Sequence, residues 1–375
     1  MKKTLKRLLS PMLALIMIFG SAAVGAVTEN DYNPLTTQAS AAAYSTGSTV
    51  ALGEYPQKKV TDEETLKALD SIEKEWISYG YLKKCSVWEN GESKETLLPN
   101  DYMKYADIEL NGTRYRAVVF SKYRHTNADT YFLYEEPIVE AHQYYNGYFV
   151  NTVYYFEYEP IKWRVLDAAS GFLVTDQLVD SQPFDAKAEY DYEASEYYRN
   201  NYEQSSLRRW LNDEFYNVAF SSEEQSKIKV THIETKDSYE DTHFECAPTD
   251  DKVFLLSAWD LTNTRYGFGP FVDIISKDRW TSGTDYAKCQ GLNVIKDYVR
   301  SNYMTLTPGY RDNEICFFNG KMQENSLSSY EDLTVTRTCY GVRPAIKING
   351  LSSLKKAQPA VRGVDFNGKT ANSSI

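Results

Sequence analysis

The sequence lacks the short motifs that identify most hydrolases, metalloenzymes and nucleotide-binding proteins. There is no HExxH zinc helix, no GxSxG turn around a nucleophilic serine, no Walker loop and no GxGxxG after a strand. Histidine is scarce, with four in 375 residues. His243-Phe244-Glu245-Cys246 places two potential zinc ligands close together, but a structural zinc takes four protein ligands and no second pair stands nearby. We therefore predict no metal, no cofactor and no catalytic residue of a familiar type.

Long apolar runs are also missing, apart from Leu8 to Phe19 near the N-terminus. This run is shorter than the roughly 20 residues of a membrane span. Basic residues precede it and small residues follow, which is the pattern of a secretory signal peptide. Val24-Gly25-Ala26 is the predicted cleavage site and Ala39-Ser40-Ala41 the alternative; an uncleaved N-terminal anchor is the competing interpretation. We expect a secreted, extracellular protein whose mature chain has no membrane span.

Positive charge is under-represented. The chain has 41 Lys and Arg against 52 Asp and Glu, and loss of residues 1–26 removes four cations and no carboxylate, so the formal charge changes from −11 to −15. Nucleic-acid binding normally needs a concentrated basic face. The composition thus argues against nucleic acid as a partner, and the acidic surface favours solubility.

Cysteine is uncommon as well, and its odd count of five leaves at least one free thiol in an exported protein. None lies in a CxxC pair. Cys316 and Cys339 fall on expected C-terminal strands and are the candidate disulfide. Buried, reduced cysteines acting as small apolar residues are the equally open alternative.

Local patterns predict helices interspersed among hairpins. Thr61 and Glu64 have capping-box form and begin an expected helix from about Asp62 to Ser78, and further helices are expected at Ser206–Glu214 and Asp285–Gln290. The turn signals Asn111-Gly112, Asn146-Gly147 and Asn319-Gly320 each separate expected strands. Val153–Tyr158 and Ile161–Leu166 read as two strands broken by Pro160. This order, without a βαβ rhythm, predicts an α+β fold around a mostly antiparallel, twisted sheet with long irregular segments.

The domain organisation follows from composition. We expect a signal peptide at 1–26, a flexible leader at 27–49, a single large domain at 50–350 and a flexible tail at 351–375. An inserted helix and hairpins are expected at about 61–160. No Pro/Gly/Ser-rich linker divides the large domain.

Five ordered motifs resemble a family of secreted and surface proteins of Gram-positive bacteria known as a domain of unknown function. They are Gly53–Gln57, Ile161–Asp167, Ser205–Asn212, Asp251–Ser257 and Gly341–Ile348. The last of them is also similar to the closing strand of C-type-lectin-like domains and their sulfatase-modifying relatives. That likeness implies a C-type-lectin-like architecture, with a ligand held by the irregular segment before the closing strands. Here Pro344 stands where the modifying enzymes carry a reactive cysteine, which argues against their activity.

Tyrosine is the abundant residue, with 31 copies. Tyrosine suits binding surfaces because it joins a broad apolar face to a hydroxyl, although it is also a favourable strand residue. We therefore predict a ligand site at Tyr303, Tyr310, Arg311, Asp312 and Asn313, with an ordinary polar turn as the alternative.

Tyr144, Tyr145 and Tyr148 form a second tyrosine cluster, to which the site would move if the first segment proved inert. Trp163, Trp210 and Arg343 are expected in the structural core, with Arg343 paired to a buried carboxylate or carbonyl.

The function hypotheses differ in kind. The favoured one is a non-enzymatic module that binds carbohydrate or protein at the cell surface. The alternatives are a secreted hydrolase of surface polymers, which would need two carboxylates at roughly 5–10 Å, and a self-associating surface protein.

Overall fold

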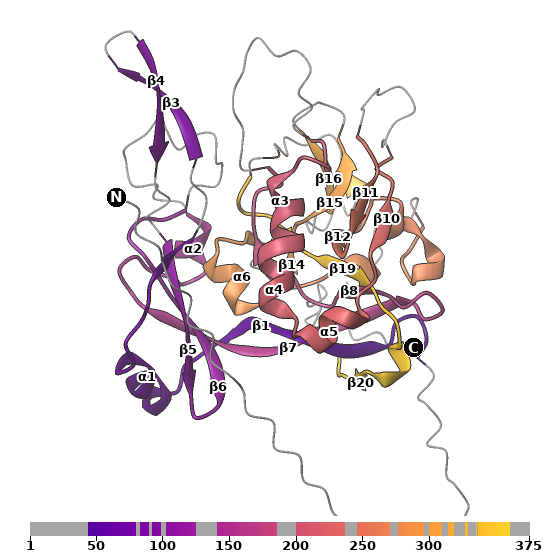
Figure 1. Cartoon of the computed structure of the whole chain (residues 1–375), viewed down its shortest axis with the longest axis horizontal. Coiled ribbons are helices and arrows are strands. Elements are labelled where there is room, and N and C mark those ends of the chain that lie inside the picture. Colours follow the sequence, from indigo (N-terminus) through magenta and orange to yellow (C-terminus); the bar gives the residue numbers. More distant parts are fainter. Residues whose placement is uncertain are drawn as a thin grey trace, which may run out of the picture. The chain divides into compact units, whose positions relative to one another are not determined.

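Antiparallel sheets with short helices between them dominate the architecture, so the chain is α+β as the sequence predicts (Figure 1). The computed structural model describes residues 44–79, 83–89, 92–98, 103–124, 141–185, 200–236, 246–270, 277–295, 300–309, 314–318, 327–328, 335 and 337–360. In this described part the largest sheet has nine strands, and all its pairs are antiparallel. Its main path runs β12 (Val253–Leu255), β19 (Pro344–Lys347), β8 (Phe172–Thr175), β7 (Tyr154–Asp167), β6 (Thr113–Phe120), β5 (Met103–Leu110) and β2 (Ile77–Ser78), while β1 (Thr49–Lys59) pairs with β7 and β20 (Lys355–Lys356) with β1.

A second sheet brings together strands that lie far apart in the sequence. Its order is β17 (Leu327–Ser328), β16 (Ile315–Phe318), β15 (Tyr303–Pro308), β18 (Gly341–Val342) and β9 (Asp180–Ser181). β15 and β18 are parallel and the other pairs antiparallel. Three two-stranded units complete the described strands: β3 (Lys83–Glu89) with β4 (Glu92–Leu98), β10 (Thr231–Ile233) with β11 (Thr249–Asp251), and β13 (Val294–Ile295) with β14 (Arg300–Ser301).

Strand β7 is the longest strand of the large sheet and pairs with three others. One edge pairs with β1, while the other pairs with β6 over its first half and with β8 over its second half. The expected break at Pro160 is wrong, because β7 continues through it. Pro160 lies opposite Glu54, next to a register shift at which Gly53 has φ +71°. A proline cannot donate to a ladder and is tolerated at such a bulge.

The helices are short and occupy connections between strands. The predicted Asp285–Gln290 helix is confirmed as α6, and Ser221 caps α5 through a complete capping box with Glu224. The predicted Ser206–Glu214 helix continues further, through a π turn. The described helices are α1 (Glu63–Asp70), α2 (His142–Tyr145), α3 (Ser206–Trp210), the π segment η2 (Leu211–Phe215), α4 (Tyr216–Ala219), α5 (Ser222–Lys227) and α6 (Asp285–Cys289), with 3-10 turns η3 (Asp260–Thr262), η4 (Thr264–Tyr266), η5 (Lys277–Arg279) and η6 (Leu351–Ser353).

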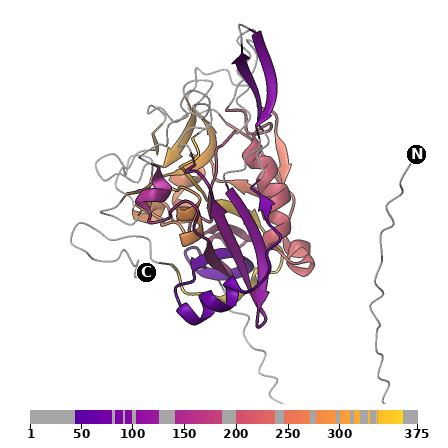
Figure 2. The ribbon, with the colours of Figure 1, turned by 90° about the vertical axis from the view of Figure 1, so that its left-hand side faces the viewer.

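Helix α1 is half as long as the sequence suggests. Asp62, not Thr61, is the N-cap and accepts a hydrogen bond from the Thr65 N–H at 2.8 Å. The helix ends at Asp70, where Lys74 Nζ donates to the Leu69 carbonyl at 2.9 Å. Residues 77–78 pair with the edge of β5 instead, so Ile77 belongs to a strand and not to the expected helix. In Figures 1 and 2, α1 stands beside β5 and β6, and Leu69 is buried against Ala106 and Tyr115 there.

Of the three Asn-Gly turn signals, one closes a hairpin as predicted, one does not, and one is not described. Asn111 and Gly112 both have positive φ and close the β5–β6 hairpin, as predicted. Asn146-Gly147 does not join two strands. It ends the short helix α2, where Gly147 has φ +82°. Asn319-Gly320 lies outside the described residues.

Order extends past the expected end of the large domain. Residues assigned from the sequence to the tail form η6 and then β20, which pairs with β1 through Val50 and Lys356. The Tyr44 hydroxyl donates to the Leu354 carbonyl at 2.6 Å. Residues near both ends of the described part therefore meet on the same sheet.

We predict that Trp163→Ala lowers the free energy of unfolding by about 3–5 kcal/mol, because deleting a fully buried indole leaves a cavity. Trp163 has no exposed surface, and its Nε1 donates to the Leu52 carbonyl at 2.8 Å. Trp210→Ala should behave similarly, since Trp210 is 6% exposed. Urea denaturation measures both variants against Trp259→Ala, a control at an indole that is 50% exposed. Near-wild-type stability of the first two variants would contradict their place in the core.

Candidate functional site

Asp180 is a carboxylate with no exposed surface, on β9. Its Oδ2 accepts hydrogen bonds from the hydroxyls of Tyr55 at 3.0 Å and Tyr79 at 3.2 Å, and its Oδ1 accepts one from the Ser181 N–H at 2.7 Å. Burial raises the pKa of this carboxyl to about 6, outweighing the hydrogen bonds and the charge of Arg124. A carboxyl with such a pKa marks a candidate acid/base site.

Arg116 on β6 forms the cationic side of this buried cluster. Its Nε and Nη2 both lie 2.8 Å from the carboxylate oxygens of Asp107, and its Nη1 donates to the Tyr286 hydroxyl at 3.3 Å. The guanidinium carbon stands 4.4 Å from the Tyr105 ring centroid. Arg116 is 4% exposed, so the ion pair and the ring contacts are made largely away from water. It joins the β5–β6 hairpin to α6.

Glu214 lies at the surface end of the cluster. It belongs to the π segment η2, a type of helical turn that is frequent at functional sites. Partial burial and the negative charges of Asp213 and Asp180 raise the pKa of its carboxyl. Most glycoside hydrolases use a pair of carboxyl groups, so Asp180 and Glu214 are candidates for such a pair.

The surroundings of Asp180 favour a structural role over catalysis. Both of its oxygens are occupied by donors of the same chain, and no part of the side chain reaches water. A catalytic acid or base must come within hydrogen-bond distance of the substrate. Asp180 instead joins Tyr55 and Tyr79, from the N-terminal strands, to the second sheet.

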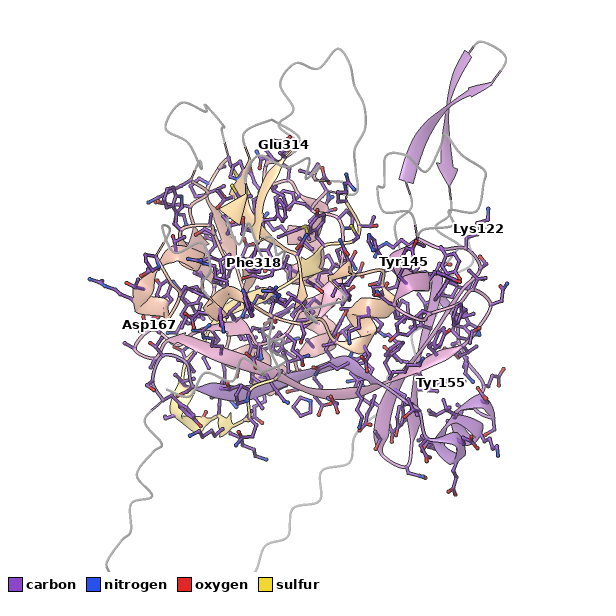
Figure 3. The ribbon with its side chains drawn as sticks, turned by 180° about the vertical axis from the view of Figure 1, so that it is seen from behind. Lys122, Tyr145, Tyr155, Asp167, Glu314 and Phe318 are labelled. Carbon is purple, nitrogen blue, oxygen red and sulfur yellow. The ribbon has the colours of Figure 1, made fainter. Side chains whose placement is uncertain are left out.

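The second candidate site is an exposed group of aromatic rings, which we call the aromatic platform: Tyr123, Tyr144, Tyr145 and Phe149. Tyr144 is its centre. The ring centroid of Tyr144 lies 5.9 Å from that of Tyr145, 5.7 Å from Phe149 and 6.1 Å from Tyr123, all near edge-to-face. Tyr144 is 49% exposed, and Tyr145 and Phe149 are each 47% exposed. Figure 3 draws Tyr145 at the surface.

Helix α2, which carries the platform, is anchored from below. A helix of four residues has no stability of its own. Gln143 has no exposed surface and donates to the Cys289 carbonyl at 2.8 Å, while Asn146 donates to the carbonyls of Lys288 at 3.0 Å and Leu292 at 2.8 Å. These side chains satisfy carbonyls at the C-terminal end of α6, which a helix leaves unpaired. The platform thus rests on a fixed base.

The ligand site predicted at Tyr303–Asn313 is not supported at the one position the structure describes. Tyr303 is 1% exposed and stacks on Phe318 with centroids 5.0 Å apart, and its hydroxyl donates to the Arg279 carbonyl at 2.9 Å. Its ring offers no face to a ligand. Tyr310, Arg311, Asp312 and Asn313 lie outside the described residues.

The residues expected in the core lie inside. Trp163, Trp210 and Arg343 are 0%, 6% and 1% exposed. Arg343 Nε donates to the Thr175 carbonyl at 3.0 Å and Nη1 to the Tyr303 hydroxyl at 3.1 Å. Of the two partners expected for Arg343, the structure shows the carbonyl.

Cys316 and Cys339, the candidate disulfide, are both free and buried. Burial raises the pKa of the Cys339 thiol to about 11, which disfavours a reactive thiolate. The structure therefore does not contain the disulfide predicted between Cys316 and Cys339.

The sequence indicates part of the aromatic platform, but it does not indicate the buried cluster around Asp180 and Arg116. The tyrosine pair Tyr144-Tyr145 is conspicuous in the sequence, whereas Tyr123 and Phe149 join it only through folding. Asp180 and Arg116 stand in no motif, and nothing in the sequence places them together. Among the described residues, no group of three or more His, Cys, Asp or Glu is arranged to hold a metal ion. The same residues include no helix long and apolar enough to cross a membrane.

We predict that Asp180→Asn changes how stability depends on pH. The folded pKa of about 6 exceeds the unfolded value of about 3.9, so the folded state holds its proton more tightly and the carboxyl destabilises the fold increasingly as pH rises from 4 to 6. The unfolding free energy of the variant minus that of wild type should therefore rise by about 2 kcal/mol between pH 4 and pH 7. Urea titrations at several pH values measure it, with Glu73→Gln as the control for an exposed carboxylate. A constant difference across this range would contradict the prediction.

Comparison with known proteins identifies part of the chain. Searches of curated proteins and of solved structures found no match. Residues 170–350 match the model of a family described as "Domain of unknown function (DUF6273)". This match begins in the turn between β7 and β8, so it contains three of the five motifs, and Gly53–Gln57 and Ile161–Asp167 precede it. The chain therefore carries a DUF6273 domain, to which the strands before residue 170 add most of the large sheet.

Proposed function

We propose that the chain is an exported, non-enzymatic binding protein whose aromatic platform holds a carbohydrate. The observation that carries this proposal is the group of exposed rings around Tyr144. Single exposed apolar residues are ordinary, but a contiguous group of half-exposed aromatic rings marks an interaction surface. Sugar rings stack on such faces, and tyrosine hydroxyls supply hydrogen bonds beside them.

The anchoring of α2 supports a preformed site. Gln143 and Asn146 hold the helix through three hydrogen bonds to the α6 end, so the rings lose little freedom when a ligand arrives. Preorganisation of this kind lowers the entropic cost of binding. A small rigid group of rings fits one or two sugar units better than the roughly 800 Å² that each partner contributes to a standard protein interface.

Export is part of the proposal and rests on the N-terminal sequence. The basic residues, the short apolar run and the small-residue exit that end near Ala26 have the form of a signal peptide.

A likeness to C-type-lectin-like domains remains part of the proposal as well. It is supported by the motif Gly341–Ile348, which forms β18 in the second sheet and the whole of β19 in the large sheet. The lectin-like likeness places a ligand before the closing strands, whereas the exposed rings lie on the segment before β7.

Hydrolysis is the second candidate function, favoured by the raised pKa of Glu214, to which burial and the charges of Asp213 and Asp180 contribute. The enclosed position of Asp180 speaks against it. Release of reducing ends from a surface polysaccharide by the mature chain, lost in Glu214→Gln, would favour hydrolysis over simple binding.

We predict that Tyr144→Ala and Phe149→Ala each lower affinity for a bound glycan about tenfold, because each removes a stacking face. The melting temperature should fall by no more than a few degrees, since both side chains are half exposed. A glycan array with the mature chain selects the ligand, and calorimetry measures the affinity.

Trp259→Ala is the matched control, because Trp259 is an equally exposed aromatic residue outside the platform. It should bind as wild type does. Wild-type affinity in both platform variants, or no glycan retained by the wild-type chain, would refute the proposed function.

A further inference from the structure

A continuous path of hydrogen bonds joins the buried carboxyl group of Asp180 to helix α2. The Ser181 N–H donates to Asp180 Oδ1 at 2.7 Å, and the carbonyl of the same serine accepts a hydrogen bond from Arg124 Nη1 at 2.6 Å. The Arg124 N–H in turn donates to Gln143 Oε1 at 2.7 Å. Gln143 is the buried residue of α2 and directly precedes Tyr144, the centre of the aromatic platform. Asp180 is therefore connected to the platform through the interior of the protein.

Asp180 and Arg124 are oppositely charged groups in this interior. Asp180 has no exposed surface and Arg124 is 5% exposed. Burial raises the pKa of the Asp180 carboxyl to about 6, while the hydrogen bond from the Ser181 N–H and the charge of Arg124 lower it. The attraction is mutual, so the ionised carboxylate also stabilises the buried guanidinium. Protonation of Asp180 removes this contribution, and a buried charge that loses compensation becomes less stable.

The tyrosine donors of Asp180 do not belong to α2. Oδ2 of Asp180 accepts hydrogen bonds from Tyr55 on β1 and from Tyr79, which follows β2. Local opening of α2 releases Gln143 from Arg124 and leaves both hydroxyls in place. The carboxyl group then stays buried but loses part of the attraction of Arg124, so its pKa is higher in the open state. Protonation favours the state with the higher pKa, so α2 opens more readily as the pH falls through about 6.

Global unfolding responds to pH in the opposite direction. The unfolded chain places Asp180 in water with a pKa of about 3.9, so protonation of this carboxyl favours the folded state over the unfolded one. In the locally opened state the carboxyl group remains inside the protein, and protonation favours opening. A measurement that resolves α2 from the rest of the fold therefore distinguishes the two processes.

Other titratable groups reach Asp180 from several elements. They are Tyr55 from β1, Tyr79 after β2, Arg116 from β6, Arg124 after β6, Glu214 from η2, and Tyr286 and Cys289 from α6. Burial raises the pKa of Tyr55, Tyr286 and Cys289, so these three groups keep their protons between pH 5 and 7.5.

Two groups need a control of their own. Burial and the neighbouring negative charges of Asp213 and Asp180 raise the pKa of the Glu214 carboxyl. On α2 itself, burial and then the charge of Arg337 lower the pKa of His142. Both groups can change charge near the pH range in which Asp180 does, so each is a competing explanation for a response of α2 to pH.

We propose that Asp180 and Arg124 make the aromatic platform sensitive to pH, because protonation of Asp180 loosens α2 and the rings lose their fixed base. The consequence for binding rests on the proposed carbohydrate function, since a platform that must first become ordered binds more weakly. The chain then holds its ligand near neutral pH and releases it in acid.

Hydrogen–deuterium exchange of the wild-type chain at pH 5 and pH 7.5 tests this proposal without a ligand. The amides of residues 145–148 donate to carbonyls within 141–144, so their exchange reports the opening of α2. Their protection, corrected for the intrinsic pH dependence of exchange, should be about fivefold lower at pH 5, the lower end of coupling between two sites. Strand β6 is the internal reference and should keep its protection.

Variants identify the group that responds. Asp180→Asn imitates the protonated carboxyl and should show low protection of the amides of residues 145–148 at both pH values. Where this variant does not fold, Arg124→Gln takes its place and should likewise abolish the response to pH. His142→Gln and Glu214→Gln are the matched controls and should respond to pH as wild type does.

The outcomes separate this proposal from the proposed function. Equal or greater protection of α2 at pH 5 in wild type would overturn the role of Asp180, and so would a response that persists in Asp180→Asn or disappears in His142→Gln or Glu214→Gln. None of these results touches carbohydrate binding, because exchange is measured without a ligand. A wild-type chain that retains no glycan, in contrast, refutes the proposed function and leaves the pH-dependent anchor of α2 in place.

Discussion

Hydrogen bonds from Tyr55 and Tyr79 to the buried side chain of Asp180 connect the segments before residue 170 to the second sheet. A charge without contact to water is unfavourable unless donors surround it, and here two of the three donors are tyrosine hydroxyls from distant segments. Asp180 belongs to the DUF6273 match, whereas Tyr55 and Tyr79 precede it. The strands before residue 170 therefore share hydrogen bonds with the matched segment and do not form a separate unit. Strand β7 pairs with β8 and so joins them to the matched segment in the large sheet. Tyr55 and Tyr79 also donate hydrogen bonds to the carboxylate of Asp180 in that segment.

The same interior network determines where the exposed rings stand. The Ser181 carbonyl, one residue after Asp180, accepts a hydrogen bond from Arg124, whose own N–H donates to Gln143 at 2.7 Å. Gln143 is the buried residue of α2, and its neighbour Tyr144 is the centre of the platform. A surface site that is poor in regular structure thus obtains its rigidity from side chains inside the protein rather than from a long helix.

Local signals predicted the features that local chemistry controls. Asn111-Gly112 closes its hairpin because both residues readily adopt positive φ, and the predicted Asp285–Gln290 helix forms as α6 behind its N-cap Thr284. The predictions fail where distant contacts decide. Residues 77–78, which were expected in a helix, pair with the edge strand β5. Strand β7 continues through Pro160 because a bulge in β1 beside Gly53 lies opposite it. Tyr303 and Tyr144 both belong to tyrosine clusters in the sequence, but Tyr303 is buried in the structure and Tyr144 is half exposed.

Tyrosine content by itself therefore has two meanings in this protein, and the partner of the hydroxyl tells them apart. Inside, the hydroxyl replaces water for a buried acceptor, as Tyr55 does for Asp180 and Tyr148 does for the Asp285 carbonyl. On the platform, Tyr144 is 49% exposed and packs against the rings of Tyr123, Tyr145 and Phe149. A mutation that exposed the inner tyrosines would lose the fold before it gained a binding surface, because their hydroxyls satisfy groups that cannot stay buried alone. A substitution at Tyr144 or Phe149 would change the exposed rings and leave these inner hydrogen bonds in place.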